Sequence, residues 1–145
     1  MASPLSDERA IENLISRYSF LVDDGDFAGL GQLLRFCAFT LGSGPAVRGP
    51  EAIAELARAA LRTYEDGTPH TRHVTTNVLI EVDPGAVTAS ARSYYTVLQC
   101  LPDFPLQVIA TGTYHDRFER PEGLWSFTER RVQTRFAGDT SRHRR

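Results

Sequence analysis

The sequence predicts a single α+β domain in which about three N-terminal helices pack in a strongly curved, mainly antiparallel sheet. Three observations lead to this fold class. The chain has 145 residues, of which 41% are hydrophobic and 23% charged, as in one ordinary globular domain. Helical periodicity dominates residues 7–64, and segments rich in Val, Thr, Tyr and Phe follow after Gly67. Helices that precede a run of consecutive strands are typical of α+β proteins rather than of βαβ folds.

Three helices are expected in the first part of the chain. The first is expected over residues 7–24, with Ser6 as its N-cap. Its apolar residues recur three or four positions apart: Ala10, Ile11, Leu14, Ile15, Tyr18, Leu21 and Val22. A short second helix is expected over 26–34. A third is expected over 51–64, because Pro50 suits the first helical position.

The other regular segments are predicted to be strands, a short one over 36–41 and four longer ones over 70–82, 86–101, 106–120 and 124–136. Turns rich in Pro and Gly separate the four: Asp83-Pro84-Gly85, Pro102-Asp103-Phe104-Pro105 and Pro121-Glu122-Gly123. These short connections favour an antiparallel meander. One domain is expected over residues 1–136, and the basic tail 137–145 is expected to be disordered or to lie over a pocket mouth.

The composition excludes several function classes. All 16 basic residues are arginine, which excludes a lysine Schiff base, pyridoxal phosphate held by lysine and a P-loop lysine. A net charge of -2 gives no electrostatic footprint for nucleic acid. Cys37 and Cys100 have no metal-ligand spacing and are expected to be buried free thiols.

Neither a metal ion nor a membrane is an expected partner. His70 and His73 are three residues apart in a predicted strand, so their side chains should point to opposite faces. The segment MASPLSDERA lacks a signal-peptide pattern, and no apolar run reaches about 18 residues. A cytoplasmic protein is therefore expected.

A few polar residues stand where an apolar interior is predicted. Asp23 lies in the last turn of the first helix, where the helix dipole disfavours a carboxylate. Such an aspartate is either exposed to solvent or held for a purpose. His73 begins the first long strand, with Asn77 on the same face, although a lone histidine there can also be a packing residue. Arg130 is one of three adjacent charged residues on the last strand.

An ordered set of short motifs spans about residues 5–136. Its members are Arg9-Ala10-Ile11-Glu12-Asn13-Leu14, Asp23-Asp24-Gly25-Asp26, Arg48-Gly49-Pro50-Glu51-Ala52-Ile53, His73-Val74-Thr75-Thr76-Asn77, Gly112-Thr113-Tyr114-His115-Asp116, Gly123-Leu124-Trp125 and Arg130. Through them the chain resembles the SnoaL-like members of the nuclear transport factor 2-like superfamily, with scytalone dehydratase, ketosteroid isomerase and hexachlorocyclohexane dehydrochlorinase. The resemblance implies a cone-shaped α+β barrel around a deep, mostly apolar pocket.

The resemblance also implies roles for particular residues. In the dehydratase and dehydrochlorinase branches, an aspartate on the first helix and a histidine on the strand after the third helix act as a dyad, and these positions are Asp23 and His73 here. The dehydrochlorinase-type arginine falls on Arg130, and a tyrosine falls on Tyr114. A second histidine of the fungal dehydratase has no counterpart near residues 89–93. The expected substrate-binding residues are Arg130, Tyr114, Tyr95 and Asn77.

The function expected from these residues is that of a lyase or isomerase of the dehydratase, cyclase or dehydrochlorinase kind, acting on a small apolar cyclic substrate without a cofactor. Neutral imidazole suits proton abstraction near neutral pH, and an arginine or a phenol could stabilise the developing charge. One alternative is a non-catalytic module that binds a small ligand or a protein partner. Another is the small subunit of an oxygenase-type complex.

A homodimer is also expected, because apolar side chains should line the outward face of the sheet. The residues expected there are Tyr94, Val97, Val108, Phe118 and Phe127. A single β-bulge would reverse which alternating set faces inward.

Overall fold

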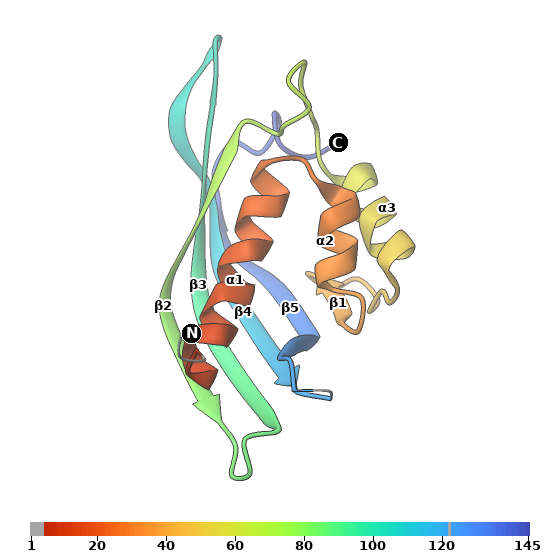
Figure 1. Cartoon of the computed structure of the whole chain (residues 1–145). Helices are drawn as coiled ribbons and strands as arrows, with labels where there is room; N and C mark the ends of the chain where they lie inside the picture. The colour runs from red at the N-terminus through yellow and green to blue at the C-terminus, as the bar shows by residue number, and fades with distance from the viewer. Residues whose placement is uncertain (1–4, 122) are drawn as a thin grey trace.

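The structure is a computed structural model that describes residues 5–121 and 123–145. Residues 1–4 of the expected domain, and Glu122 of the expected turn at 121–123, lie outside these ranges. Three helices pack against one five-stranded mixed sheet (Figure 1). The elements are α1 (Asp7–Asp23), α2 (Phe27–Leu33), β1 (Ala38–Leu41), α3 (Pro50–Ala60), β2 (Thr71–Val82), β3 (Thr88–Leu101), β4 (Phe104–Glu119) and β5 (Ser126–Ala137). The predicted α+β fold class is confirmed, with a curved sheet that does not close into a barrel.

The strand order in the sheet is β1-β5-β4-β3-β2. Strands β2 to β5 form the antiparallel meander that the sequence predicts. Strand β1 pairs in parallel with β5, with Ala38 opposite Glu129, and this pairing makes the sheet mixed. The β2–β3 register shifts between Thr76 and Leu79, so the alternation of side chains changes within β2.

Helix α1 begins and ends where its sequence favours it. The hydroxyl oxygen of Ser6 accepts a hydrogen bond from the backbone N–H of Arg9 at 3.1 Å, which caps the helix. After α1 the chain turns at Gly25, whose φ is +70° and whose added Cβ would lie 2.1 Å from the carbonyl oxygen of Gly67. This close approach requires glycine, and it brings the end of α1 against the loop before β2.

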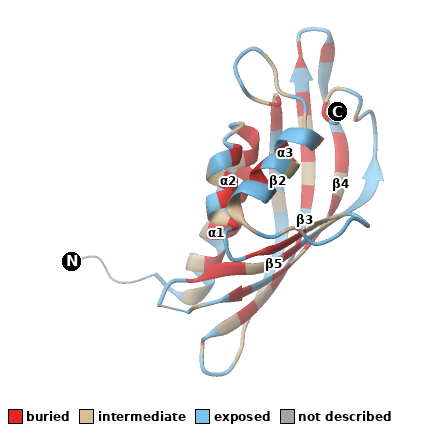
Figure 2. Cartoon of the chain, turned by 90° about the vertical axis from the view of Figure 1, so that its right-hand side faces the viewer, coloured by how far each residue is buried: buried red, intermediate tan, exposed pale blue. Residues whose placement is uncertain are grey.

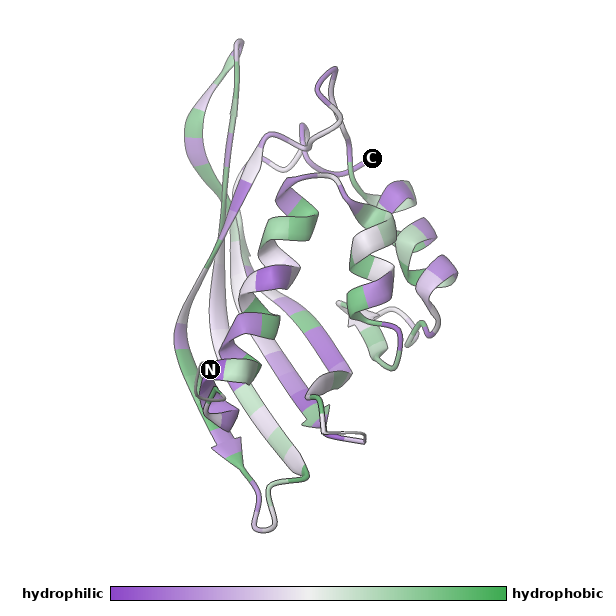
Figure 3. Cartoon of the chain, viewed as in Figure 1, coloured by the Kyte–Doolittle hydropathy of each residue, from purple (hydrophilic) through white to green (hydrophobic). Residues whose placement is uncertain are grey.

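The core lies between α1 and the concave face of the sheet. Hydrophobic and hydrophilic positions alternate in bands along α1 (Figure 3), and the apolar bands are buried. Along β3, odd-numbered residues from Ala89 to Leu101 are buried, and the even-numbered ones are half-buried or exposed (Figure 2). These elements bury one continuous cluster of apolar side chains, as expected for a single domain.

This alternation corrects two sequence-based expectations. Val97, Phe118 and Phe127 face the core instead of the outer face, because each lies on the buried parity of its strand. Tyr94 and Val108 are 53% and 51% exposed and do face outward. Cys37 is buried as expected, but Cys100 is exposed because it has the outward parity of β3; both thiols are free. No helix among the described residues is long and apolar enough to cross a membrane.

Candidate functional site

A cavity of about 760 Å³ lies between the helices and the concave face of the sheet. This volume is in the range of small-molecule sites. Apolar side chains from α1, α2, α3 and the strands form most of its wall. Its ionisable lining residues are Tyr18, His73, Tyr95, Tyr114, His143, Arg144 and Arg145.

Asp23 and His73, which the sequence predicts as a pair, are in contact at this cavity. Nδ1 of His73 lies 2.6 Å from Oδ1 of Asp23, and the backbone N–H of His73 donates to Oδ2 at 2.8 Å. The hydroxyl of Thr71 also donates to Oδ1, at 2.8 Å. Thr71 and His73 share one face at the start of β2, so both reach the carboxylate at the end of α1. The side chain of Asp23 is 8% exposed and that of His73 is 9% exposed.

The hydrogen bonds to Asp23 fix the tautomer of His73. Burial alone would raise the pKa of Asp23, but hydrogen bonds from the ring and backbone of His73 and from Thr71, with the charge of His73, lower that pKa below its ordinary value. An ionised carboxylate only accepts hydrogen bonds, so Nδ1 of His73 carries the proton. Nε2 is then the basic nitrogen of a residue that lines the cavity.

Two of the predicted substrate-binding residues, Tyr95 and Tyr114, form part of the cavity wall. Their rings stack with centroids 4.7 Å apart. Gly112, opposite Tyr95 on β4, makes this possible, because an added Cβ would lie 2.5 Å from the Tyr95 ring. The hydroxyl groups of Tyr95 and Thr134 are hydrogen-bonded at 2.9 Å.

Tyr18 completes this wall from α1, with its ring edge-on to Tyr114 at 5.6 Å. Burial raises the pKa of Tyr18 to about 12 and raises that of Tyr114 well above its ordinary value, so both hydroxyls stay protonated. Within the described part of the chain, neither hydroxyl forms a hydrogen bond. Both are therefore donors available to a ligand. From the sequence, Tyr18 is expected only as one of the apolar residues of the first helix.

Arg130 lies behind this wall and does not line the cavity. Its Cζ atom is 3.6 Å from the centroid of the Tyr114 ring and 4.1 Å from that of Tyr18. Its Nε atom is 3.1 Å from Oδ1 of the fully buried Asp116, yet among the described residues neither side chain forms a hydrogen bond. Burial raises the pKa of Asp116 to about 6, although Arg130 opposes that shift. Arg130 thus contacts the cavity only through aromatic rings.

Asn77 is not brought to the cavity. It is exposed and has a φ of +54°, within the register shift of β2. The expectation that Asn77 shares a face with His73 requires unbroken alternation along the strand, and the irregularity of β2 breaks that alternation.

His143 is a cavity residue that the sequence analysis missed. Residues 137–145 are expected from the sequence either to be disordered or to lie over a pocket mouth. In the structure they lie over the cavity, and Ala137, Thr140 and His143 are among its lining residues. His143 is 7% exposed, and its ring centroid is 6.1 Å from that of His73. No local sequence signal indicates this contact, since the two histidines are 70 residues apart.

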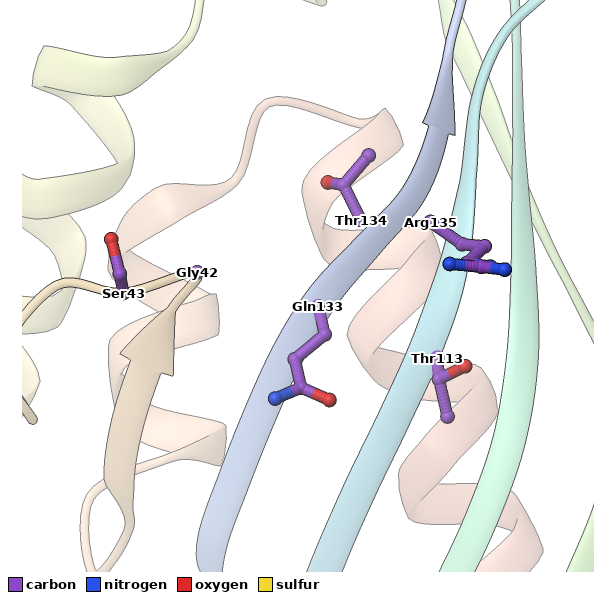
Figure 4. Close-up of a pocket in the computed structure, with 6 residues that line it drawn as sticks. All are labelled: Gly42, Ser43, Thr113, Gln133, Thr134 and Arg135. Atoms are coloured by element: carbon purple, nitrogen blue, oxygen red, sulfur yellow. The ribbon is translucent and has the colours of Figure 1, made fainter.

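A second hollow of about 490 Å³ lies at the β1–β5 edge of the sheet. Figure 4 shows its lining residues spread over the end of β1, β5 and β4: Gly42, Ser43, Thr113, Gln133, Thr134 and Arg135. It contains neither a carboxylate nor a histidine, so it lacks the acid–base groups of the larger cavity. Among the described residues, no three His, Cys, Asp or Glu side chains are grouped to hold a metal ion.

Comparison with known families and structures agrees with this architecture. The family model of the SnoaL-like domain matches residues 3–131. No curated protein matches the chain.

Three solved structures illustrate the similarity. A variant of Rv3472, a protein of unknown function from Mycobacterium tuberculosis, is 27% identical over 89% of this chain and 72% of its own, with a TM-score of 0.73. An NTF2-like protein with a cystatin-like fold from Novosphingobium aromaticivorans is 21% identical over 94% and 86%, with a TM-score of 0.74. LinA is 23% identical over 89% and 86%, with a TM-score of 0.68.

Proposed function

The chain belongs to the SnoaL-like domain family, and we propose that it is a cofactor-independent lyase or isomerase that removes a proton from a small, apolar cyclic substrate. The observation that carries this proposal is the 2.6 Å contact between Asp23 and His73 at a largely apolar cavity. Removal of a proton from carbon needs a base that is unprotonated near pH 7 and basic enough to take the proton, and imidazole meets this requirement. The reaction is of the dehydratase, cyclase or dehydrochlorinase kind.

His73 is the base and Asp23 its positioning partner in this proposal. Nε2 takes a proton from a substrate carbon next to a carbonyl or a leaving group. Asp23 holds the ring through Nδ1 and stabilises the imidazolium that forms, as the carboxylate does in a catalytic triad. The apolar wall strengthens this interaction because little water screens it.

The hydroxyls of Tyr18 and Tyr114 are the donors for the negative charge that develops on the substrate. Preorganised donors at such a position are effective because they need no reorganisation during the reaction. Arg130 acts behind them: its positive charge opposes the rise that burial causes in the pKa of both tyrosines. It thereby makes each hydroxyl a better hydrogen-bond donor.

The ring opening of 5-nitrobenzisoxazole tests this proposal without knowledge of the natural substrate. This flat, apolar compound opens when one C–H proton is removed, and it releases a coloured phenolate. We expect the wild-type rate to exceed that of His73→Ala by about 10²-fold to 10⁴-fold. His115→Ala is the matched control, because His115 lines a separate hollow on the outer face of the sheet, and it should keep the wild-type rate. Equal rates in wild type and His73→Ala would contradict the proposal.

A non-catalytic ligand-binding module is the alternative. Such a module needs the cavity but has no need for a histidine whose tautomer is fixed by a buried carboxylate. Calorimetry with the same compound separates the two functions: a binding module would take it up in wild type and in His73→Ala alike, with no product.

We also propose that the chain is a homodimer joined through the outer face of the sheet. Tyr94, Leu106 and Val108 are 53%, 68% and 51% exposed on β3 and β4, and exposed apolar groups of this kind favour association. Light scattering on the eluted protein should give twice the chain mass in wild type and a lower mass in Tyr94→Arg. A monomeric wild type would contradict the dimer and leave the proposed chemistry unaffected.

A further inference from the structure

The C-terminal segment 138–145 forms a strap across the cavity, anchored at both sides. The backbone N–H of Arg62 donates to the carbonyl of His143 at 2.8 Å, and that of Arg145 donates to the carbonyl of Ala60 at 3.0 Å. The side chain of Gln99 donates to the carbonyl of Arg142 at 3.0 Å. The strap is thus tied to the end of α3 and to β3.

A bidentate ion pair fixes the strap at the β3–β4 turn. The two terminal nitrogens of Arg142 lie 2.9 and 2.8 Å from the two carboxylate oxygens of Asp103. Figure 1 shows the C-terminus beside the loop that follows α3. His143 stands between these anchors, so its position does not depend on contacts of its own ring.

One ring nitrogen of His143 lacks a hydrogen-bond partner among the described residues. The residue is 7% exposed and lines the cavity, and its Nδ1 atom is buried without a hydrogen bond to any described residue. Buried polar groups are normally hydrogen-bonded, and because His143 lines the cavity, a ligand bound there can supply the partner that this imidazole lacks. The His73 ring is 6.1 Å away between centroids, which leaves both rings within reach of one small substrate.

We propose that the strap supplies a second catalytic histidine, His143, which donates a hydrogen bond to the substrate atom that gains negative charge. This inference rests on the proposed function. His73 takes the proton, the C–H electron pair becomes the new double bond, and the leaving group departs with the electron pair of the bond that breaks. The N–H of His143 donates to that departing atom. His73 then returns its proton to the leaving group, which restores its neutral imidazole, and His143 keeps its own proton throughout.

The electrostatic surroundings keep His143 neutral, as this role requires. Burial first, and then the neighbouring His73 and Arg144, lower the pKa of His143 to about 4, while Asp23 opposes that shift. A neutral imidazole can stabilise an oxyanion through its N–H without adding a charge. It also adds no permanent positive charge beside His73.

A series of benzisoxazoles with increasingly basic phenolate leaving groups tests this role in the full chain. The compounds are 5-nitrobenzisoxazole, 5-chlorobenzisoxazole and unsubstituted benzisoxazole, and in each the N–O bond breaks as the C–H proton leaves. A donor to the departing oxygen matters most for the most basic phenolate. We expect His143→Ala to lower the rate for the unsubstituted compound by about 10-fold to 100-fold, and that for the nitro compound by less than about 3-fold. His143→Gln, which keeps an N–H donor, should restore part of the loss.

Two comparisons make the outcome decisive. Arg142→Ala removes the ion pair to Asp103 and loosens the strap that carries His143, so it should give a smaller loss of the same kind, largest for the unsubstituted compound. If His143→Ala lowered all three rates by one uniform factor, or left them at the wild-type values, the role of His143 would be overturned while the His73-dependent rate upheld the proposed function. A wild-type rate that does not depend on His73 would overturn both.

Discussion

Two buried aspartates of the described chain, Asp23 beside His73 and Asp116 beside Arg130, differ in how their carboxylate oxygens are hydrogen-bonded. Asp23 accepts three hydrogen bonds, from Thr71 and from the ring and backbone of His73. Asp116 lies 3.1 Å from Arg130 but forms no hydrogen bond among the described residues. The first pair is at the cavity, whereas the second is behind the tyrosines.

This difference separates the proposed proton-transfer pair from the pair that lies behind the cavity wall. Hydrogen bonds lower the pKa of Asp23 and orient a histidine toward a space large enough for a ligand. Burial raises the pKa of Asp116 to about 6, and its arginine stacks on aromatic rings. A buried ion pair without hydrogen bonds contributes little net stability, so the second pair serves to hold a cation under Tyr18 and Tyr114.

The largest expected effect comes from breaking the pair behind the cavity wall. Arg130→Met leaves the carboxylate of Asp116 buried without a counter-ion, which should cost about 3–5 kcal/mol of unfolding free energy. The double variant Arg130→Met/Asp116→Leu should recover most of that loss, since no charge then remains buried. Urea denaturation measures both. Equal stability of the single and double variants would mean that the two side chains are not coupled.

Next in size is the effect on catalysis of changing the other carboxylate. Asp23→Asn should lower the rate with 5-nitrobenzisoxazole by about 10³-fold, or about 4 kcal/mol of barrier, because an amide can hold the wrong tautomer of His73. Its unfolding free energy should change by less than about 2 kcal/mol. A wild-type rate in Asp23→Asn would mean that the reaction does not depend on the carboxylate of Asp23.

The two carboxylates should also give opposite dependences of stability on pH. The folded pKa of Asp116 is about 6, raised from 3.8. Between these values the folded state binds more protons than the unfolded state, so this contribution to stability is lost as pH rises toward 6. Relative to Asp116→Asn, wild type should lose about 2–3 kcal/mol over that window.

Asp23 has the opposite sign because its folded pKa is lowered. Its contribution is present above the unfolded pKa of 3.8 and is lost as pH falls through the folded value. Denaturation curves of wild type and Asp23→Asn across acid pH check this. If both substitutions, Asp23→Asn and Asp116→Asn, changed the pH dependence of the unfolding free energy in the same direction, the two carboxylates would not differ in the predicted way.

The smallest expected effect concerns the wall between the two pairs. Tyr95→Phe removes the 2.9 Å hydrogen bond to Thr134 and keeps the stacked ring, so it should cost about 1 kcal/mol of stability. The benzisoxazole rate should change by less than about 3-fold. A much larger loss of rate, with the fold intact by circular dichroism, would make the Tyr95 hydroxyl a donor to the substrate.

The elements of the fold could be predicted from the sequence because they follow local rules. The cap at Ser6, the apolar spacing in α1 and the turns between strands each act over a few residues. The pairing of β1 with β5 could not be predicted, because it joins segments about 90 residues apart. Asp23 and His73 were predicted through the motifs around them, and the structure brings them together.

The other site residues depend on features that the sequence hides. An irregularity of β2 moves Asn77 off the face of His73, and strand parity alone does not reveal it. Arg130 lies on the inward face, yet the tyrosine rings stand between it and the cavity. His143 reaches the cavity through long-range contacts of the strap, among them the backbone hydrogen bonds with Arg62 and Ala60, which no spacing rule foresees.

The tautomer of His73 is the most direct test of the central claim, that Asp23 holds this ring as a base facing the cavity. Long-range proton–nitrogen NMR at neutral pH distinguishes the two ring nitrogens. We expect a proton on Nδ1 and a bare Nε2 in wild type, with this preference lost in Asp23→Asn. A proton on Nε2 in the wild-type protein would contradict that claim, because His73 would then present a donor, and no base, to the cavity.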